Sequence, residues 1–258
     1  DGAVHGLNGS GRAPAAMKPD HFGTATAMPR RGWDAVTVPG AVSAWVTLSS
    51  RFGRLPFAEL TRPAVELARG GFPVAPQTAR LWARAAERLR TFEEWSRVFL
   101  VNGEPPRPGQ IVRFPEHADT LEAIGGSGGA DFYTGSLARR IADAARRDGG
   151  LLAADDLAAH IADWVEPISI DYRGWRLHEI PPNGQGIAAL VALGLLSGID
   201  LGSLQVDCPD VVHAQIEAMK LAFADVHAHV GDPGSMRIAP EDLLSDAYLA
   251  EQRARISP

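Results

Sequence analysis

The spacing of apolar residues along the chain predicts six helices and three strand regions. Apolar positions that recur every three or four residues place the helices near residues 56–69, 78–100, 136–147, 186–198, 209–229 and 241–254. Shorter apolar runs between turn-forming residues place strands near 4–8, 34–38 and 164–180. No internal repeat or long linker divides this pattern, so residues 1–258 are expected to form a single α/β domain. The strands are too few to close a core unaided, which indicates a second chain.

The most informative stretch of the pattern joins a predicted strand pair to a predicted helix. Residues 165–175 are typical of two strands with a turn at Arg173 and Gly174, and an apolar helix begins near Ile187. Between them lies Pro181-Pro182-Asn183-Gly184-Gln185-Gly186, whose glycines let the backbone approach a substrate or a neighbouring strand closely. This arrangement resembles the large subunit of γ-glutamyltranspeptidase-like proteins, in which a PPxxGG loop stands between a strand and a helix.

Six further segments resemble motifs of the same family and occur in the family's order. They are Asn8–Pro14, Val38–Trp45, Gly53–Val74, Asp131–Gly135, Gly149–Leu152 and Ile216–Asp225. No single motif is specific, but their order and spacing together are. The form Asn8-Gly9-Ser10-Gly11-Arg12-Ala13-Pro14 is similar to the acylase-like and amidase-like branch more than to the glutathione-handling one.

The resemblance implies an α/β fold, an αββα sandwich of the N-terminal nucleophile hydrolase type that a second chain completes. Family members are precursors, or zymogens, that cut themselves before a threonine, which then serves as the nucleophile of a hydrolase or acyltransferase. This chain would be the large subunit of such a heterodimer, lacking the family's N-terminal segment, with the threonine on a small subunit from the same precursor. The resemblance assigns no catalytic residue to residues 1–258, and it calls for no cofactor and no metal.

The candidate substrate-binding residues are Asn8, Ser10, Arg12, Asn183, Gly184 and Gln185. In the γ-glutamyl transferases, an arginine four residues before the proline holds the donor's α-carboxylate, and alignment on Ala13-Pro14 places Ser10 there. A hydroxyl cannot replace a bidentate guanidinium. If residues 6–14 form a strand, Arg12 shares a face with Ser10 and reaches the same pocket. The alternative is that Arg12 points to solvent or pairs locally.

Three other groups of residues match known chemical patterns, and each has a structural interpretation that we favour. Gly125-Gly126-Ser127-Gly128-Gly129 matches a nucleophile elbow, but a helical pattern precedes it where that motif needs a strand. Asp225, His227, His229 and Asp232 have workable metal-ligand spacing, but they also suit a solvated helix end. We expect His213, Glu217 and Lys220 to form a partly buried ion pair.

Composition narrows the classes of function. The net charge of −6 is spread without long runs, so it gives no footprint for nucleic acid or an anionic membrane. The single Cys208 excludes an internal disulfide, and no apolar run reaches the roughly 18 residues of a membrane span. The chain begins at Asp1 without methionine, which is compatible with a removed signal peptide, although we favour a cytoplasmic location.

The expected activity is cleavage of an amide in a small, amino-acid-like molecule through the partner's threonine. Two alternatives stay open. One is a family member repurposed in natural-product biosynthesis to cleave another bond, including a carbon–carbon bond. The other is a catalytically silent binding protein, which the residue after the cleavage point would distinguish.

Overall fold

The computed structural model describes residues 2–256, so Asp1, Ser257 and Pro258 lie outside the described residues. Contacts between residues divide the chain into two compact units. Unit 1 contains residues 2–10 and 162–256, and unit 2 contains residues 11–161. Among the described residues, no helix combines the length and the apolarity that a membrane span requires.

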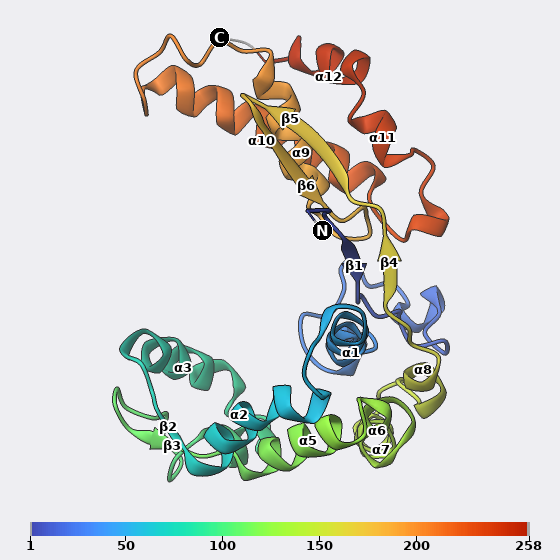
Figure 1. Ribbon diagram of the computed structural model, residues 1–258, viewed down its shortest axis with the longest axis vertical. Coiled ribbons are helices and arrows are strands. Elements are labelled where there is room, and N and C mark those ends of the chain that lie inside the picture. The colour runs from blue at the N-terminus through green and yellow to red at the C-terminus, as the bar shows by residue number, and fades with distance from the viewer. Residues whose placement is uncertain (1, 257–258) are drawn as a thin grey trace. The chain divides into compact units, whose positions relative to one another are not determined.

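Unit 1 contains two antiparallel strand pairs. Strand β1 (Gly6–Asn8) pairs with β4 (Asp163–Val165), and β5 (Ile168–Tyr172) forms a hairpin with β6 (Trp175–Glu179) (Figure 1). The hairpin turns at Arg173 and Gly174, whose φ angles of 50° and 87° are both positive, as a two-residue type I′ turn requires. The predicted turn and the predicted strands of this region are therefore confirmed.

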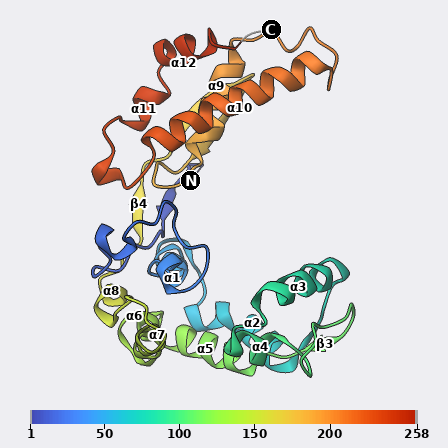
Figure 2. The ribbon, with the colours of Figure 1, turned by 180° about the vertical axis from the view of Figure 1, so that it is seen from behind.

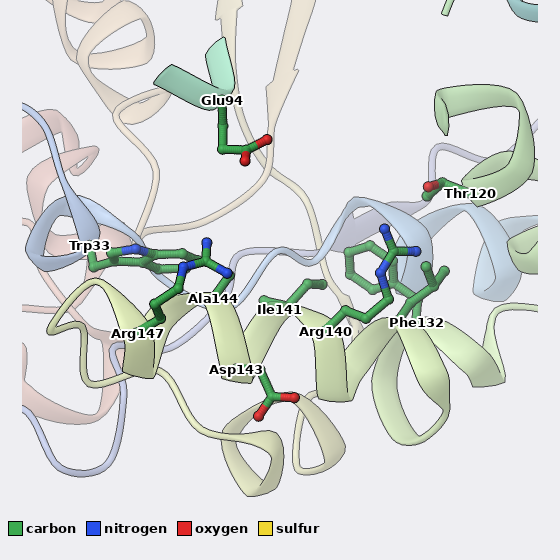
Figure 3. Close-up of a pocket in the computed structure, with 10 residues that line it drawn as sticks. Trp33, Glu94, Thr120, Phe132, Arg140, Ile141, Asp143, Ala144 and Arg147 are labelled. Carbon is green, nitrogen blue, oxygen red and sulfur yellow. The ribbon is translucent and has the colours of Figure 1, made fainter. Parts of the chain in front are cut away.

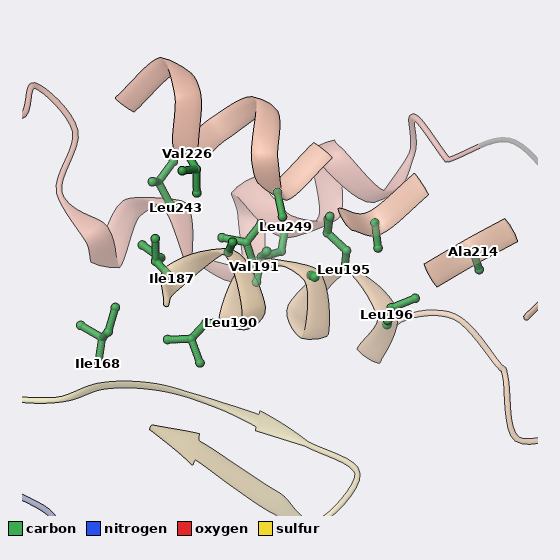
Figure 4. Packing of buried hydrophobic residues seen from close by; sticks show 14 residues of the cluster. Ile168, Ile187, Leu190, Val191, Leu195, Leu196, Ala214, Val226, Leu243 and Leu249 are labelled. Carbon is green, nitrogen blue, oxygen red and sulfur yellow. The ribbon is translucent and has the colours of Figure 1, made fainter. Parts of the chain in front are cut away.

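The core of unit 1 forms around α9 (Ile187–Ser197), an almost wholly apolar helix. The hairpin packs on one side of it, and α10 (Pro209–His229) and α12 (Asp246–Arg253) pack on others (Figure 4). Leu190 and Leu195 are completely buried as a result. A helix that is apolar on all sides is stable only when it is covered on all sides, and this packing supplies that cover.

A buried polar contact joins α10 to α12 beside this core. The Tyr248 hydroxyl donates a hydrogen bond of 2.7 Å to Oδ1 of Asp225, which is almost completely buried. Burial and the neighbouring carboxylate together raise the pKa of Tyr248 to about 12. The hydroxyl therefore stays protonated and keeps donating over the physiological pH range.

Short helical segments complete unit 1 and separate two elements that the sequence pattern joined. A 3-10 turn, η3 (Pro233–Ser235), follows α10, and α11 (Pro240–Leu243) precedes α12. The single helix predicted over 241–254 is thus wrong, because the Ser245 side chain caps α12 by accepting from the Tyr248 amide.

Unit 2 is mainly helical, with one two-stranded ribbon (Figure 2). Helix α2 (Phe57–Gly70) packs on α5 (Pro115–Gly126), and the ribbon pairs β2 (Phe72–Pro73) with β3 (Ile111–Val112). Its elements in chain order are η1 (Pro19–Phe22), η2 (Trp33–Ala35), α1 (Ala41–Phe52), α2 (Phe57–Gly70), β2 (Phe72–Pro73), α3 (Pro76–Leu89), α4 (Glu93–Phe99), β3 (Ile111–Val112), α5 (Pro115–Gly126), α6 (Ala130–Thr134), α7 (Ser136–Arg147) and α8 (Ala154–Ala158).

Two predictions for unit 2 are corrected. The helix expected over 78–100 is two helices, because Phe92 adopts an extended conformation and the Ser96 hydroxyl donates to the Arg90 carbonyl at the break. The strand expected over 34–38 is absent: Trp33–Ala35 forms a 3-10 turn, and Val38 makes a single backbone bond, from its amide to the Arg12 carbonyl.

The segment Asp131–Gly135 has a structural role in this unit. The Asp131 carboxylate accepts hydrogen bonds from the amides of Ser136 and Leu137 at the start of α7, and these bonds lower its pKa. The Tyr133 hydroxyl accepts from the Ser43 amide and donates to the Pro39 carbonyl, both at 2.9 Å. Hydrogen bonds of Tyr133 therefore join the family-like segment Asp131–Gly135 directly to the segment Val38–Trp45.

Arg253 offers a test of how the end of α9 is stabilised. Its guanidinium donates 2.8 Å hydrogen bonds to the carbonyls of Gly194 and Leu195 in the last turn of α9, where the Ser197 hydroxyl also donates to the Gly194 carbonyl at 2.7 Å. We expect Arg253→Ala to lower the free energy of unfolding by about 2 kcal/mol, since two charge-assisted bonds are lost. Denaturant titration would measure this change. Arg237→Ala, which removes an exposed arginine of the same unit, should change stability little, and an equal loss in both variants would contradict the assigned role.

Candidate functional site

Three of the predicted site residues are brought together in unit 1. The Asn8 side chain at the end of β1 donates from Nδ2 to Oδ1 of Asn183, at 2.9 Å. Its own Oδ1 accepts from the Ser10 amide, also at 2.9 Å. Asn8 therefore uses both ends of its amide to join the segment after β1 to the loop that precedes α9.

The same contact ends the strand. Because the Ser10 amide turns back to the side chain two residues earlier, the backbone leaves the extended ladder after Asn8. The strand predicted over residues 6–14 is thus limited to Gly6–Asn8. The argument that Ser10 and Arg12 share a strand face is wrong for this reason.

The loop from Pro181 to Gly186 exposes amide side chains at the start of α9. Asn183 and Gln185 are exposed, and the position of Gly184 has open space around it. The loop is fixed by its ends, since Pro182 is buried and the Gln185 carbonyl accepts from the Ala188 amide. The side-chain amides of Asn183 and Gln185 can each donate and accept, so they suit a polar, uncharged part of a ligand.

A carboxylate that the sequence argument missed lies at this loop. Glu179 is the last residue of β6, and its Oε2 lies only 2.3 Å from where a β-carbon on Gly186 would stand. Glycine is therefore needed at position 186 for space, and its φ of −56° makes no special demand. A carboxylate beside a helix start is stabilised by the helix dipole. An acidic residue just before a Pro-Pro turn was the available signal in the sequence.

Arg12 belongs to unit 2. Its guanidinium is exposed and forms no hydrogen bond or ion pair with another described residue. Its backbone is held, because its carbonyl accepts from the Val38 amide and Gly11 touches Val38 so closely that a β-carbon would lie 1.6 Å from the carbonyl oxygen. The local pairing that the sequence left open is absent among the described residues, so the charge is available to a ligand.

The candidate set contains binding groups and no nucleophile paired with a base. Ser127, the residue of the elbow-like motif, follows a helix, and its hydroxyl caps the turn by accepting from the Asp131 amide. That environment lacks the strand that a nucleophile elbow requires, so the serine-hydrolase interpretation is wrong. The candidate residues offer hydrogen-bond donors and acceptors and one exposed guanidinium.

The other two polar groups also have structural explanations. Asp225 bonds to Tyr248 and Asp232 caps η3, and among residues 2–256 no three potential ligands form a group that could hold a metal ion. Lys220 pairs with Glu217 at 2.7 Å, so the predicted ion pair is confirmed, although the lysine side chain is largely exposed.

Known proteins of one family match this chain over most of its length. The family model described as gamma-glutamyltranspeptidase matches residues 1–258. A glutathione hydrolase-like proenzyme of Bacillus subtilis is 35% identical over 97% of this chain and 48% of its own length. Acylase ACY 1 proenzyme of a Pseudomonas strain is 35% identical over 87% of this chain and 40% of its own.

A solved structure adds the fold. Cephalosporin acylase from Bacillus halodurans superposes with a TM-score of 0.94 at 43% identity, over 99% of this chain and 49% of that one. The chain thus spans about half the length of the relatives it matches.

Removal of the Asn8 side chain tests whether it orders the site. Asn8→Ala loses both amide contacts, so amide hydrogen exchange at Ser10 should accelerate and kcat/KM should fall about fivefold. Asn8→Asp should retain most function, since a carboxylate still accepts from Ser10 and the Asn183 amide can turn to donate. Hydrogen exchange and steady-state kinetics on both variants would measure this. Equal behaviour of Ala and Asp variants would contradict the role.

Proposed function

Because the chain belongs to the gamma-glutamyltranspeptidase family, we propose that it is the large subunit of an autoprocessed amide hydrolase or acyltransferase. Its relatives are proenzymes of hydrolases and acylases, and its fold is the α/β sandwich type of the N-terminal nucleophile hydrolases. In this proposal a threonine at the start of a small subunit, cut from the same precursor, attacks the amide. Residues 1–258 then form one domain of a cytoplasmic heterodimer.

The observation that supports a partner chain is a face of the hairpin that unit 1 covers only on its β5 side. In the hairpin register, Trp175 pairs with Tyr172 and Leu177 pairs with Ile170, so these four side chains share one face. Ile170 and Tyr172 pack against the α9 core, yet Trp175 is 81% exposed and Leu177 is 37% exposed. A second chain that extends this sheet would cover them and pair the free edge of β6.

The role of this chain in the reaction is to bind and orient the substrate. The exposed amides of Asn183 and Gln185 supply neutral hydrogen bonds, and Arg12 supplies a charge for a carboxylate or carbonyl oxygen. By the resemblance of residues 8–14 to the family motif, Ser10 would take the place of the arginine that holds the donor's α-carboxylate in γ-glutamyl transferases. We therefore infer a donor without that carboxylate, which agrees with the similarity to cephalosporin acylase and acylase ACY 1.

Expression of the whole precursor tests the proposal. We expect intact-mass analysis to show two chains and the processed protein to hydrolyse a simple acyl amide faster than γ-glutamyl-p-nitroanilide. The reason is that Ser10 offers no bidentate partner to the γ-glutamyl carboxylate. The precursor with alanine in place of the nucleophile is the control and should remain uncut. An active, uncut polypeptide would refute the two-chain proposal, whereas efficient γ-glutamyl hydrolysis would refute only the substrate class.

Substitution can distinguish the contribution of Arg12 to substrate binding from that of Ser10. If Arg12 contacts the substrate, Arg12→Ala loses a charge-assisted hydrogen bond worth about 1.5–3 kcal/mol, or about tenfold to a hundredfold in kcat/KM. Ser10→Ala should cost less, because a neutral hydroxyl forms a weaker bond. Self-processing, followed on a gel, should be intact in both variants. Unchanged turnover in Arg12→Ala would leave the Asn183–Gln185 loop as the main contact of this chain.

A further inference from the structure

Unit 2 contains a cavity of about 550 Å³ that none of the candidate site residues lines. Its floor is one face of α7, formed by Leu137, Ile141 and Ala144 at intervals of four and three residues. Trp33 and Phe132 form aromatic walls, and Glu94 of α4 faces the floor from the other side (Figure 3). The volume and the apolar floor are typical of a site for a small molecule, and charged side chains stand around that floor.

Most charges around this cavity are neutralised by neighbours. Arg97 donates two hydrogen bonds of 2.9 and 3.0 Å to Glu94, and Arg146 pairs with Asp143 at 2.7 Å. Arg147 pairs with Asp148 at 3.1 Å. In Figure 3, Asp143 also points away from Trp33 and Glu94. Asp143 and Arg147 therefore contribute little net charge to the cavity, whereas Glu94 shares the single positive charge of Arg97 with Glu116 and keeps part of its negative charge.

Arg140 is the exception among the lining residues. Its guanidinium forms no hydrogen bond or ion pair with another residue of the described part of the chain. Its charge acts on Glu116, but that carboxylate is already bonded to Arg97 at 2.8 and 3.0 Å. Figure 3 places the guanidinium on the side of α7 that faces the cavity, near the Phe132 wall. A planar donor at the edge of an apolar floor is suited to the carboxylate of a ligand whose body lies on that floor.

The Trp33 wall is held in place before any ligand binds. The Trp33 indole donates to Oδ2 of Asp148 at 3.3 Å, and the same carboxylate binds Arg147 through Oδ1. Gly150 packs against the Trp33 side chain so closely that a β-carbon there would lie 2.4 Å from the Trp33 β-carbon. A wall that is already ordered loses little conformational entropy on binding.

We propose that this cavity binds a small monocarboxylate with a flat apolar body. Arg140 takes the carboxylate, and the apolar body lies on the α7 floor between Trp33 and Phe132. One uncommitted guanidinium matches one carboxylate, and the Glu94 carboxylate on the opposite wall disfavours a ligand with a second negative charge. The proposal uses residues of unit 2 alone and does not depend on the proposed amide hydrolysis.

Calorimetric titration of the purified protein, cut or uncut, with 1-naphthaleneacetate and with 1-naphthaleneacetamide tests the site. The two probes share the apolar body and differ in charge. We expect the acid to bind about tenfold more tightly than the amide, because only the acid forms a charge-assisted bond with Arg140. Arg140→Gln should remove this preference by weakening the acid alone. Trp33→Ala should weaken both probes, because it removes an apolar wall.

Arg146→Gln is the matched control, since Arg146 lies on the same helix and pairs with Asp143. It should leave the affinities of both probes unchanged. An equal loss of acid binding in Arg146→Gln and Arg140→Gln would show a general effect of charge and overturn the assignment. Failure of both probes to bind the unsubstituted protein at millimolar concentration would overturn it as well.

Discussion

Burial of α9 is the constraint on which the rest of unit 1 depends. A helix that is apolar on all sides has to be covered by the hairpin, by α10 and by α12, so its position fixes theirs. Its start then places the Asn183–Gln185 loop, and its end is held by the Arg253 guanidinium. The packing is close enough that β-carbons at Gly194 and Gly198 would meet Leu249 and Arg253. The loop that we assign to the substrate is therefore set by the core beneath it.

Elements whose signals are local could be predicted from the sequence. Helix α10 was expected over 209–229 and occupies Pro209–His229, because Pro209 suits a first turn and a Gly-Asp-Pro turn follows the last. The hairpin turn at Arg173-Gly174 was found for the same kind of reason. The candidate loop was also identified, because its Pro and Gly residues separate a strand from an apolar helix.

Features that depend on contacts across the sequence could not be predicted in this way. The contact of Asn8 with the loop before α9 needs the distant Asn183, and the close passage of Gly11 needs the Val38 carbonyl. The break between α3 and α4 is local, but it depends on the extended Phe92 backbone and on the Ser96 hydroxyl that reaches back to Arg90, which the apolar spacing does not show. Asp131 and Tyr133 belong to a family-like segment, yet nothing in the sequence shows that they cap α7 and bind the start of α1.

The division of labour in the proposed enzyme follows from which surfaces this chain leaves uncovered. Helix α10 is apolar on two faces: Ala214, Ala218 and Ala222 are buried in the core, while Ile216, Met219 and Phe223 are exposed. Sequence periodicity cannot tell the inner face of such a helix from the outer one. Together with the exposed face of β6, this stripe gives the chain more apolar surface than its own core uses. Asn8, Asn183 and Gln185 lie on elements of unit 1 that this core holds, and in the proposed enzyme the partner chain would carry the nucleophile and pack on the uncovered faces.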